Sequence, residues 1–364
     1  MKKKIFFVIN TLQRGGAERV SCILANEFDK QGFEVFVICM NQAFPAYEIS
    51  PRVKLVSLLD IRGKEHIFNR AKYAWLIFSR LVQLLIKERP ACVVSFMTTA
   101  NLYSGLACIL TGVPFIISEH TTPHHTVNSF NYLKRKLTFI IYRQSKAIVV
   151  VSKGIADCIK KNKSFKKLDN FITLRNPVNV FQSLTKNQIH HRKFIIAVGR
   201  LTHVKGFDQL IDAFSNIDND SVDLLIVGGG EEYENLDRQI KSLEISDRVI
   251  LVGAKDNLQD YYSQAELLVL SSRNEGYPNV LIEAMSFGCP CIAMDCEFGP
   301  SEIITNKING ILVEQNNFRK LMLEIDYLLV NDRFRDKISA NAKLINRTNS
   351  VENITSEWKN LIFS

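Results

Sequence analysis

Two adjacent glycines near the start of the chain suggest a phosphate-binding turn. Gly15 and Gly16 follow the apolar run Lys4–Ile9 and open a helical pattern. Glycines at a strand-to-helix turn let backbone N–H groups approach a phosphate, and the helix N-terminus adds positive potential. The motif is not G-x-G-x-x-G, so a nicotinamide or flavin site loses its main support. A tight turn selected only for packing explains the same two glycines equally well.

A second loop, residues 199–206, is bounded by glycines and carries two cations. Arg200 and Lys205 follow the apolar run 194–198, at the strand end where open α/β sheets bind ligands. An arginine offers a bidentate fork and a lysine a point charge, and together they suit a diphosphate. Two solvated surface cations are the alternative for this segment taken alone.

A third loop, after the run Leu267–Leu270, combines two carboxylates, Glu275 and Glu283, with a helix start. Pro278 suits the first turn of a helix because its missing N–H would be unpaired there anyway. Free N–H groups at such a start can hold phosphate oxygens. Glu283 lies among apolar residues of that helix, where a carboxylate is costly unless it is bonded. Sugar hydroxyls are suitable partners, although a capping acid and a structural buried glutamate would explain the same residues.

Apolar runs that could position these loops alternate with helical stripes along the whole chain. The runs lack polar alternation, which predicts strands covered on both faces, as in a parallel sheet. They lie at 4–9, 34–39, 53–57, 91–96, 115–118, 147–151, 171–174, 194–198, 224–227, 249–252, 267–270, 290–294 and 311–313. Strand–helix alternation through both halves predicts an α/β protein of two doubly wound domains. We expect the boundary in the polar stretch 180–193, and a final helix near 353–362 that crosses back to the first domain.

Together the three loops resemble glycosyltransferase family 4, the retaining enzymes of the GT-B class. The likeness rests on Gly15-Gly16, on GRLTHVKG at 199–206 and on EGYPNVLIEAM at 275–285. Asn176-Pro177-Val178, the glycines at 228–230 and Asn309-Gly310 add to it. It runs from residue 3 to the mid-320s, and it is specific for fold and reaction class but not for the sugar.

The resemblance implies two Rossmann-like domains that face each other: 1–180 with 350–364 for the acceptor, and 190–349 for a nucleotide-sugar. The donor would be a UDP-hexose or UDP-N-acetylhexosamine. Arg200 and Lys205 would neutralise the leaving diphosphate, Glu275 would bond the donor sugar, and Glu283 the ribose. The other implied donor contacts are Gly15, Gly16, Gly228, Gly276, Tyr277, Pro278, Asn279 and Val280.

We expect no cofactor and no metal, because no acidic D-x-D-like pair stands at a strand end. The two cations would then stabilise the negative charge that grows on the diphosphate as the glycosidic bond breaks. The resemblance also implies retention of configuration by front-face substitution, with the leaving phosphate taking the acceptor proton.

Glu119 and His120 follow the run 115–118 and are candidates on the acceptor side. The resemblance implies that His120 contacts the donor sugar from the N-terminal domain. A lone histidine is more often structural, but its position at a strand end favours function. Glu119 is the candidate to face the acceptor, whereas His124 and His125 are interpreted as loop residues.

The net charge of +9 is divided unevenly, with +17 in residues 1–190 and −8 in residues 191–364. A basic half favours an anionic partner: a membrane surface, a phosphate-bearing acceptor or nucleic acid. Basic residues cluster within an apolar helical stretch at 132–143. That pattern favours contact with anionic lipid and a polyprenyl-diphosphate-linked saccharide as acceptor, although a core helix with a solvated charged end would look the same.

No apolar run reaches the roughly 18–20 residues of a membrane span, and the longest, at 74–86, is broken by Arg80. The N-terminal segment lacks the long apolar core and cleavage site of a signal peptide. We therefore expect a cytoplasmic protein with peripheral contact to the inner face of the cytoplasmic membrane, and eight cysteines that are reduced thiols.

Three other functions compete with glycosyl transfer. A nucleotide-sugar 2-epimerase shares the GT-B shape, but the paired glutamates with Arg200 and Lys205 favour transfer. A nucleic-acid-binding protein fits the pI of about 9.1, yet the chain has no zinc spacing, RNP-like motif or basic recognition helix. An inactive GT-B scaffold would not need the full set of cations and carboxylates.

Overall fold

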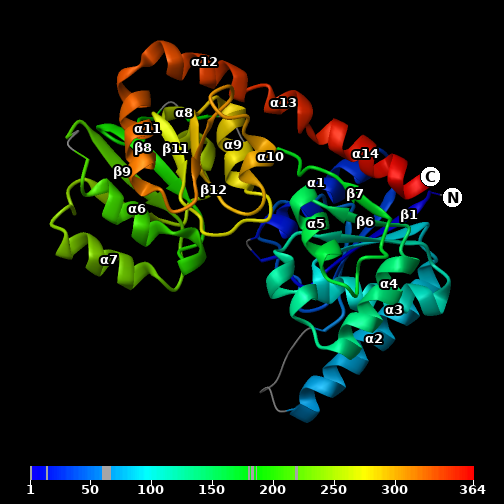
Figure 1. Ribbon diagram of the computed structural model, residues 1–364. Coiled ribbons are helices and arrows are strands. Elements are labelled where there is room, and N and C mark those ends of the chain that lie inside the picture. Colours follow the sequence, from blue (N-terminus) through cyan, green and yellow to red (C-terminus); the bar gives the residue numbers. More distant parts are fainter. Residues whose placement is uncertain are drawn as a thin grey trace. The chain divides into compact units, whose positions relative to one another are not determined.

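The computed structural model describes residues 2–13, 15–59, 67–178, 181, 184–185, 187–217 and 220–364. The chain forms two compact units (Figure 1): unit 1 comprises Met1–Pro177 with Val351–Ser364, and unit 2 comprises Val178–Ser350. Residues 180, 182–183 and 186 of the predicted linker 180–193 lie outside the described residues. Among the described helices, none is long and apolar enough to span a bilayer.

Unit 1 is built on a parallel sheet in the order β3-β2-β1-β4-β5-β6-β7. From the central neighbours β1 and β4 the chain winds outward in opposite directions, which makes this pair the topological switch point. The strands are β1 (Lys4–Ile9), β2 (Glu34–Cys39), β3 (Lys54–Ser57), β4 (Cys92–Phe96), β5 (Phe115–Glu119), β6 (Ala147–Val150) and β7 (Phe171–Thr173). The α-helices are α1 (Gly16–Lys30), α2 (Ile67–Glu88), α3 (Thr98–Thr111), α4 (Tyr132–Gln144), α5 (Lys153–Lys161) and α14 (Val351–Phe363).

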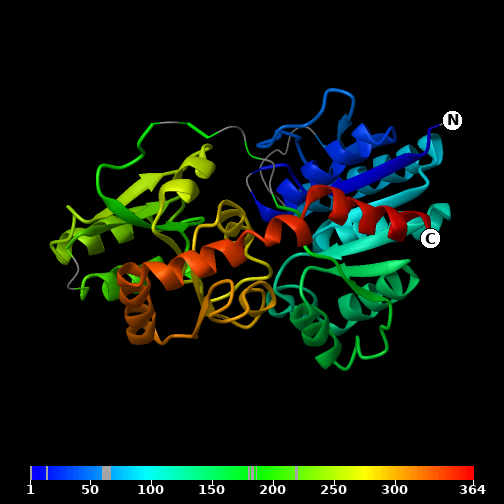
Figure 2. The same ribbon diagram turned by 90° about the horizontal axis from the view of Figure 1, so that it is seen from above.

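Helix α14 is the last element of the chain and belongs to unit 1, where it packs on α1 (Figure 2). Its buried side chains Ile354, Trp358 and Ile362 join the core formed by the strands and α1. The ring of Trp358 lies 6.1 Å from that of Phe96. The crossing back of the chain therefore adds three buried side chains to the core that α1 and the strands form in unit 1.

Unit 2 repeats the same plan with a parallel sheet in the order β10-β9-β8-β11-β12-β13. Here the switch point lies between β8 and β11. The strands are β8 (Lys193–Val198), β9 (Val222–Val227), β10 (Val249–Gly253), β11 (Leu267–Leu270), β12 (Cys291–Asp295) and β13 (Ile311–Glu314). The α-helices are α6 (Phe207–Phe214), α7 (Tyr233–Ser242), α8 (Leu258–Gln264), α9 (Asn279–Phe287), α10 (Pro300–Ile303), α11 (Phe318–Val330), α12 (Asp332–Ala342) and α13 (Ile345–Thr348).

The predicted fold class is confirmed, and the predicted strands match within one or two residues at most ends. Two predictions were wrong in detail. The edge strands β3 and β7 are not covered on both faces, since Leu55 and Ile172 are exposed. Strand β9 begins at Val222, earlier than predicted, because Asp223 enters the sheet. That buried carboxylate is paired with His190 at 2.6 Å and Arg192 at 3.1 Å.

Candidate active site

The two cation- and carboxylate-bearing loops of unit 2 leave neighbouring strands at its switch point. Residues 199–206 follow β8, and residues 271–278 follow β11. The carboxyl ends of strands at a switch point are where open α/β sheets bind ligands. The topology therefore brings together two motifs that lie about 70 positions apart in the chain.

Lys205 and Glu275 are in direct contact across these loops. The Lys205 Nζ lies 2.6 Å from the Glu275 Oε1, and the Ser272 hydroxyl donates to the same oxygen at 2.6 Å. The Lys205 side chain is 23% exposed and that of Glu275 is 9% exposed. Within the described residues no group donates to the other oxygen, Oε2, so the carboxylate keeps one oxygen for a hydroxyl donor. Arg200 lies on the same loop and is exposed.

Two glycines allow the loops at this switch point to approach one another. Gly206 has φ +67°, and a Cβ there would lie 2.3 Å from the Ser271 carbonyl oxygen. Gly228 has φ +156°, and a Cβ there would lie 1.8 Å from the Gly199 carbonyl oxygen. Only glycine fits such contacts. Gly228 is thereby given a packing role against the loop 199–206, while its predicted contact with a nucleotide-sugar stays a prediction.

Arg273 joins the two loops and was missed from the sequence. Its guanidinium forms a bidentate pair with Asp208 at 2.6 and 2.7 Å, and it also donates to the His203 carbonyl at 2.6 Å. Burial works to raise the pKa of Asp208, but the hydrogen bonds and charge of Arg273 outweigh it, so the pKa is lowered. No motif marks this arginine, whose partners among the described residues are the Asp208 carboxylate and the His203 carbonyl.

Glu283 lies on α9 and is buried, 1% exposed. The Tyr262 hydroxyl of α8 donates to its Oε2 at 3.1 Å. The helix begins at Asn279, so Pro278 is its N-cap and not, as predicted, part of its first turn. The sequence predicted that a buried Glu283 carboxylate needs a hydrogen-bonding partner, and the Tyr262 hydroxyl is such a partner. The contact with a ribose stays a prediction, and so do the contacts of Gly276, Asn279 and Val280.

Tyr277 ties the loop after β11 to the end of unit 2. Its hydroxyl accepts a hydrogen bond from the Asn349 Nδ2 at 3.0 Å, and Asn349 is fully buried. The Asn349 carbonyl in turn accepts from the Val178 N–H at 2.8 Å. Val178 and Asn349 lie at the two places where the chain passes between units. Asn349 therefore links the predicted donor loop to both passages, through its side chain on one side and its backbone carbonyl on the other. Sequence inspection gave no sign of it.

The glycine turn of unit 1 follows β1 at the switch point of that sheet, and α1 begins at Gly16 as predicted. The Gly15 N–H donates to the Tyr47 hydroxyl at 2.9 Å, and that hydroxyl donates to the Gly15 carbonyl at 3.0 Å. The Gly15 backbone is thus fixed by a tyrosine. Contact of Gly15 or Gly16 with a phosphate stays a prediction.

Glu119 does not face the surface, so its prediction as an acceptor contact was wrong. It is 1% exposed, and Thr98, Asn101 and Tyr142 of its own unit donate to its carboxylate. Burial raises the pKa of Glu119, and the three hydrogen bonds only partly offset that effect. A polar residue at a strand end can point inward, which the sequence pattern alone does not reveal.

His120 is half-buried just past β5. Its Nε2 lies 2.9 Å from the Ser118 hydroxyl, and its ring lies 5.6 Å from that of Phe96. Burial lowers the pKa of His120 to about 4. The imidazole is therefore neutral near pH 7, a form that can share a hydrogen bond with a sugar hydroxyl but carries no charge.

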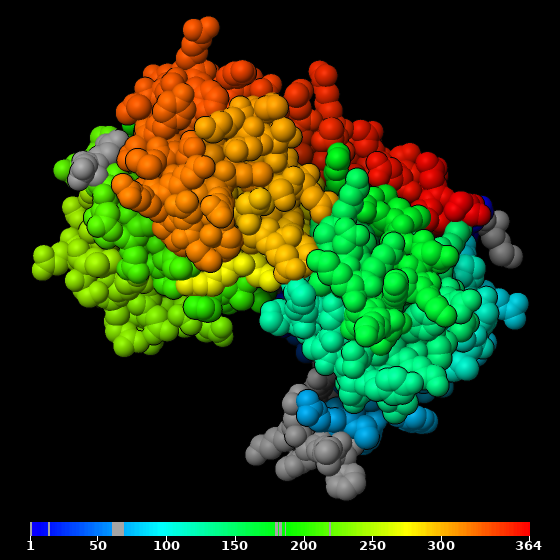
Figure 3. Space-filling view, viewed as in Figure 1, coloured from blue at the N-terminus to red at the C-terminus, as the bar shows by residue number. Residues whose placement is uncertain are grey.

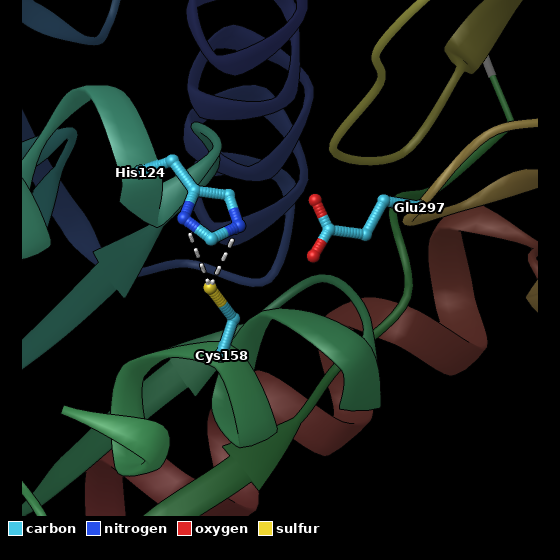
Figure 4. Close-up of side chains that lie close together, drawn as sticks. All are labelled: His124, Cys158 and Glu297. Carbon is cyan, nitrogen blue, oxygen red and sulfur yellow. Dashed lines mark hydrogen bonds between the residues drawn. The ribbon is translucent and has the colours of Figure 1, made fainter.

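All eight cysteines are buried, and none of them forms a disulfide within the described residues. In the Cys289–Cys296 segment, burial raises the pKa of Cys296 to about 12, which favours an inert thiol. Figure 4 shows Cys158 beside His124, with the Sγ 3.5 Å from the His124 Nε2. Both residues belong to unit 1, whereas Glu297, also drawn there, belongs to unit 2.

Each half of the chain matches a family of glycosyltransferases. Residues 14–180 match "Glycosyltransferase Family 4", and residues 180–345 match "Glycosyl transferases group 1". The chain is 29% identical over its full length to an uncharacterized glycosyltransferase of Haemophilus influenzae, which it also covers in full.

Two relatives with assigned activities also align over nearly all of both chains. The chain is similar to the "GalNAc-alpha-(1->4)-GalNAc-alpha-(1->3)-diNAcBac-PP-undecaprenol alpha-1,4-N-acetyl-D-galactosaminyltransferase" of Campylobacter jejuni, at 28% identity over 99% of this chain and 98% of the relative. It is similar to the amylovoran biosynthesis glycosyltransferase AmsD of Erwinia amylovora, at 25% identity over the whole of both.

Solved structures share the fold at low sequence identity. Sucrose-phosphate synthase from Thermosynechococcus elongatus superimposes with a TM-score of 0.82 at 18% identity, over 99% of this chain and 98% of that one. Anabaena HepE in complex with UDP-glucose superimposes with a TM-score of 0.81 at 17% identity, over 98% of each chain.

Proposed function

We propose that this chain, which belongs to the family 4 glycosyltransferases of the GT-B fold, moves a hexosyl or N-acetylhexosaminyl group from a UDP-sugar to a polyprenyl-diphosphate-linked saccharide. The coarser activity, glycosyl transfer in bacterial polysaccharide biosynthesis, follows from its relatives. The acceptor is supported by the undecaprenol-linked substrate in the name of the Campylobacter relative. The choice of UDP as the nucleotide is supported by the UDP-glucose bound to the structurally similar HepE.

The observation that carries the proposal is the contact between Lys205 and Glu275 at the switch point of unit 2. In this proposal Lys205, with Arg200 on the same loop, neutralises a diphosphate. The Oε2 of Glu275, to which no group among the described residues donates, accepts a hydrogen bond from a hydroxyl of the sugar attached to that diphosphate. The Lys205 ammonium suits the diphosphate of a nucleotide-sugar, and the Glu275 carboxylate beside it suits the hydroxyls of the sugar.

The proposed reaction keeps the anomeric configuration. The bond from the anomeric carbon to the diphosphate oxygen breaks, and a bond from that carbon to the acceptor hydroxyl oxygen forms on the same face. The acceptor proton goes to the departing phosphate oxygen. Arg200 and Lys205 stabilise the charge that develops on the diphosphate, which is the largest contribution such a site can make.

Metal independence and the other partners belong to the same proposal. Fixed cations supply the positive charge that a divalent ion supplies elsewhere, and neutral His120 contributes a hydrogen bond to the sugar. The Gly15–Gly16 turn holds a donor phosphate through its backbone. Because the proposed acceptor is anchored in lipid, the protein works peripherally at the inner face of the cytoplasmic membrane, in the synthesis of O-antigen, lipopolysaccharide or a related glycan.

The test measures UDP binding by thermal shift in EDTA, and then products by mass spectrometry from a panel of nucleotide-sugars with a polyprenyl-diphosphate saccharide. We expect a rise in Tm with UDP that EDTA does not remove, and a product one sugar heavier. Equal melting curves with and without UDP would contradict the site. Conversion of the donor sugar without any acceptor would instead indicate an epimerase.

A further inference from the structure

Helix α11 of unit 2 exposes large apolar side chains along one side. Val330 is 78% exposed, Leu323 62% and Tyr327 46%. They are spaced i, i+4 and i+7, so they form one stripe along the helix. The opposite side of α11 is buried in the core of unit 2, where Leu321 and Leu328 lie. Single exposed apolar residues are ordinary, but a stripe on an anchored helix is the kind of patch that marks an interaction site.

A hollow of about 390 Å³ adjoins this stripe. Its walls come from α11, from the first turn of α12 and from Lys307, and they include the side chains of Leu323, Tyr327 and Phe334. The rings of Tyr327 and Phe334 lie 5.5 Å apart. The surface therefore combines projecting apolar side chains with a recess beside them, and such a surface can pack against a copy of itself.

Figures 1 and 3 show where this surface lies in unit 2. Helix α11 packs on α6 and α12, and Figure 1 shows α11 and α12 in orange. In the space-filling view of Figure 3, the orange atoms of this part of the chain form much of the visible face of unit 2. The stripe is thus presented by a helix that unit 2 itself holds in place.

The charged residues beside the stripe change sign along the chain. Arg319 and Lys320 stand in the first turn of α11 and are exposed. Asp326 lies in the second half of α11, and Asp332, whose side chain is 77% exposed, begins α12. If two copies pack with their α11 helices antiparallel about a two-fold axis, the basic first turn of each copy lies toward the acidic residues of the other. The surface is therefore complementary to itself in charge.

We propose that the Leu323–Tyr327–Val330 stripe, with the hollow beside it, is the surface through which two copies of this chain form a two-fold symmetric dimer. Burial of the two stripes against each other provides the driving force, and the opposite charges at the two ends set the antiparallel direction. An anionic membrane fits this surface poorly, because it would repel Asp326 and Asp332. The inference rests on α11 and α12 and needs nothing from the donor site.

The experiment is sedimentation equilibrium of the full chain at about 1–100 μM, the range in which interfaces of modest size associate. We expect a mass of twice 41.5 kDa at the upper concentrations. Leu323→Ser with Tyr327→Ser removes two central apolar side chains and should weaken dimerisation about 30-fold or more. Circular dichroism checks that this variant folds. A wild-type protein that stays monomeric over the whole range would overturn the proposal, and so would a dimer that this variant leaves intact.

Charge reversal tests the antiparallel arrangement. Arg319→Glu with Lys320→Glu, and separately Asp326→Lys with Asp332→Lys, place like charges opposite one another in the dimer. Each double variant alone should dimerise about tenfold more weakly or worse. A mixture of the two should recover the association, because every facing pair is then of opposite sign. Failure of the mixture to recover would show that the two copies do not meet in this way.

Matched controls separate this surface from general apolarity or charge. Leu133→Ser with Leu137→Ser removes two exposed apolar side chains from α4 of unit 1, and Lys166→Glu with Lys167→Glu reverses two exposed cations of that unit. Both should dimerise within about threefold of wild type, as exposed substitutions away from an interface do. Equal losses in these controls would contradict a dimer through α11.

Two further readouts separate the other outcomes. Flotation with vesicles containing phosphatidylglycerol tests lipid as the occupant. Vesicle binding that Leu323→Ser with Tyr327→Ser abolishes, together with a monomeric wild type, would assign the stripe to lipid and overturn the dimer. The UDP thermal shift should be the same in every α11 variant. If wild type dimerises through α11 but shows no UDP shift, the proposed function fails while the dimer stands.

Discussion

The two units share one topology, but the polar groups at the carboxyl ends of their strands differ in kind. In unit 2, the loops after β8 and β11 bring ionised groups together, with Lys205 against Glu275 and Arg273 against Asp208. In unit 1, the Glu119 carboxyl group at the end of β5 is buried under three donors, and the neighbouring His120 has its pKa lowered to about 4. Unit 2 therefore presents ion pairs at its strand ends, whereas unit 1 has a buried, hydrogen-bonded carboxyl group and a neutral imidazole there.

The largest expected effect comes from breaking the ion pair of unit 2. Lys205→Ala and Glu275→Ala should each lower kcat/KM by about 10²–10³-fold, the loss typical of removing one preorganised electrostatic group. Product formation measured by mass spectrometry checks it, with circular dichroism to confirm folding. Lys241→Ala is the matched control, because Lys241 forms a 2.6 Å pair with Asp237 on an exposed helix. Equal losses in Lys205→Ala and Lys241→Ala would mean that the switch point has no special role.

A smaller effect is expected from adding a side chain at Gly228, the glycine that lets the loops after β8 and β9 lie close together. Gly228→Ala would place a Cβ 1.8 Å from the Gly199 carbonyl oxygen, so the loop 199–206 must move. We expect a loss of about 1–3 kcal/mol in stability and about tenfold weaker UDP binding, measured by denaturant titration and calorimetry. Gly229→Ala is the control, since no atom lies within 4 Å of its added Cβ. If the two variants bind UDP equally well, the packing role of Gly228 is wrong.

A third prediction concerns the link from Tyr277 to Asn349. Asn349→Ala leaves a buried hydroxyl without its donor, at a cost of about 1–3 kcal/mol, and should raise the donor KM about fivefold with little change in kcat. Tyr277→Phe should have a similar effect, and the double variant should be no worse than either single one. Asn346→Ala is the control, because Asn346 donates to the Ser286 carbonyl at 2.8 Å but does not reach this loop. Additive losses in the double variant would show that the two residues act separately.

The smallest expected effect is a pH dependence of the folding stability, caused by the neutral His120 of unit 1. Burial lowers the pKa of His120 from 6.5 to about 4, so the unfolded chain takes up this proton at a higher pH than the folded chain. The stability that results is complete above pH 6.5 and is lost as the pH falls toward 4. Urea unfolding of wild type and His120→Gln from pH 4.5 to 7.5 measures it. The variant should lack part of the acid-side slope, and identical slopes would mean that His120 is not buried as described.

The sequence predicted the parts of this molecule that local pattern controls. Unbroken apolar runs located the strands, and Gly206 and Pro278 marked the turns that carry Lys205 and Glu275. It failed where burial depends on distant residues. Asp223 enters β9 because His190 and Arg192 contact its carboxylate, and Glu119 turns inward because the Tyr142 hydroxyl donates to it there. Arg273 and Asn349 were missed for the same reason, since their partners are backbone carbonyls or single side chains far along the chain.

The placement of α14 has a consequence for how the protein is made. Ile354, Trp358 and Ile362 fill the core of unit 1 but follow unit 2 in the chain, so the ribosome adds them after unit 2. At about 5–20 residues per second, unit 2 is translated while the N-terminal sheet still lacks this cover. The first unit to emerge is therefore the last to be finished, and its uncovered apolar face is the part of the nascent chain that a chaperone would meet.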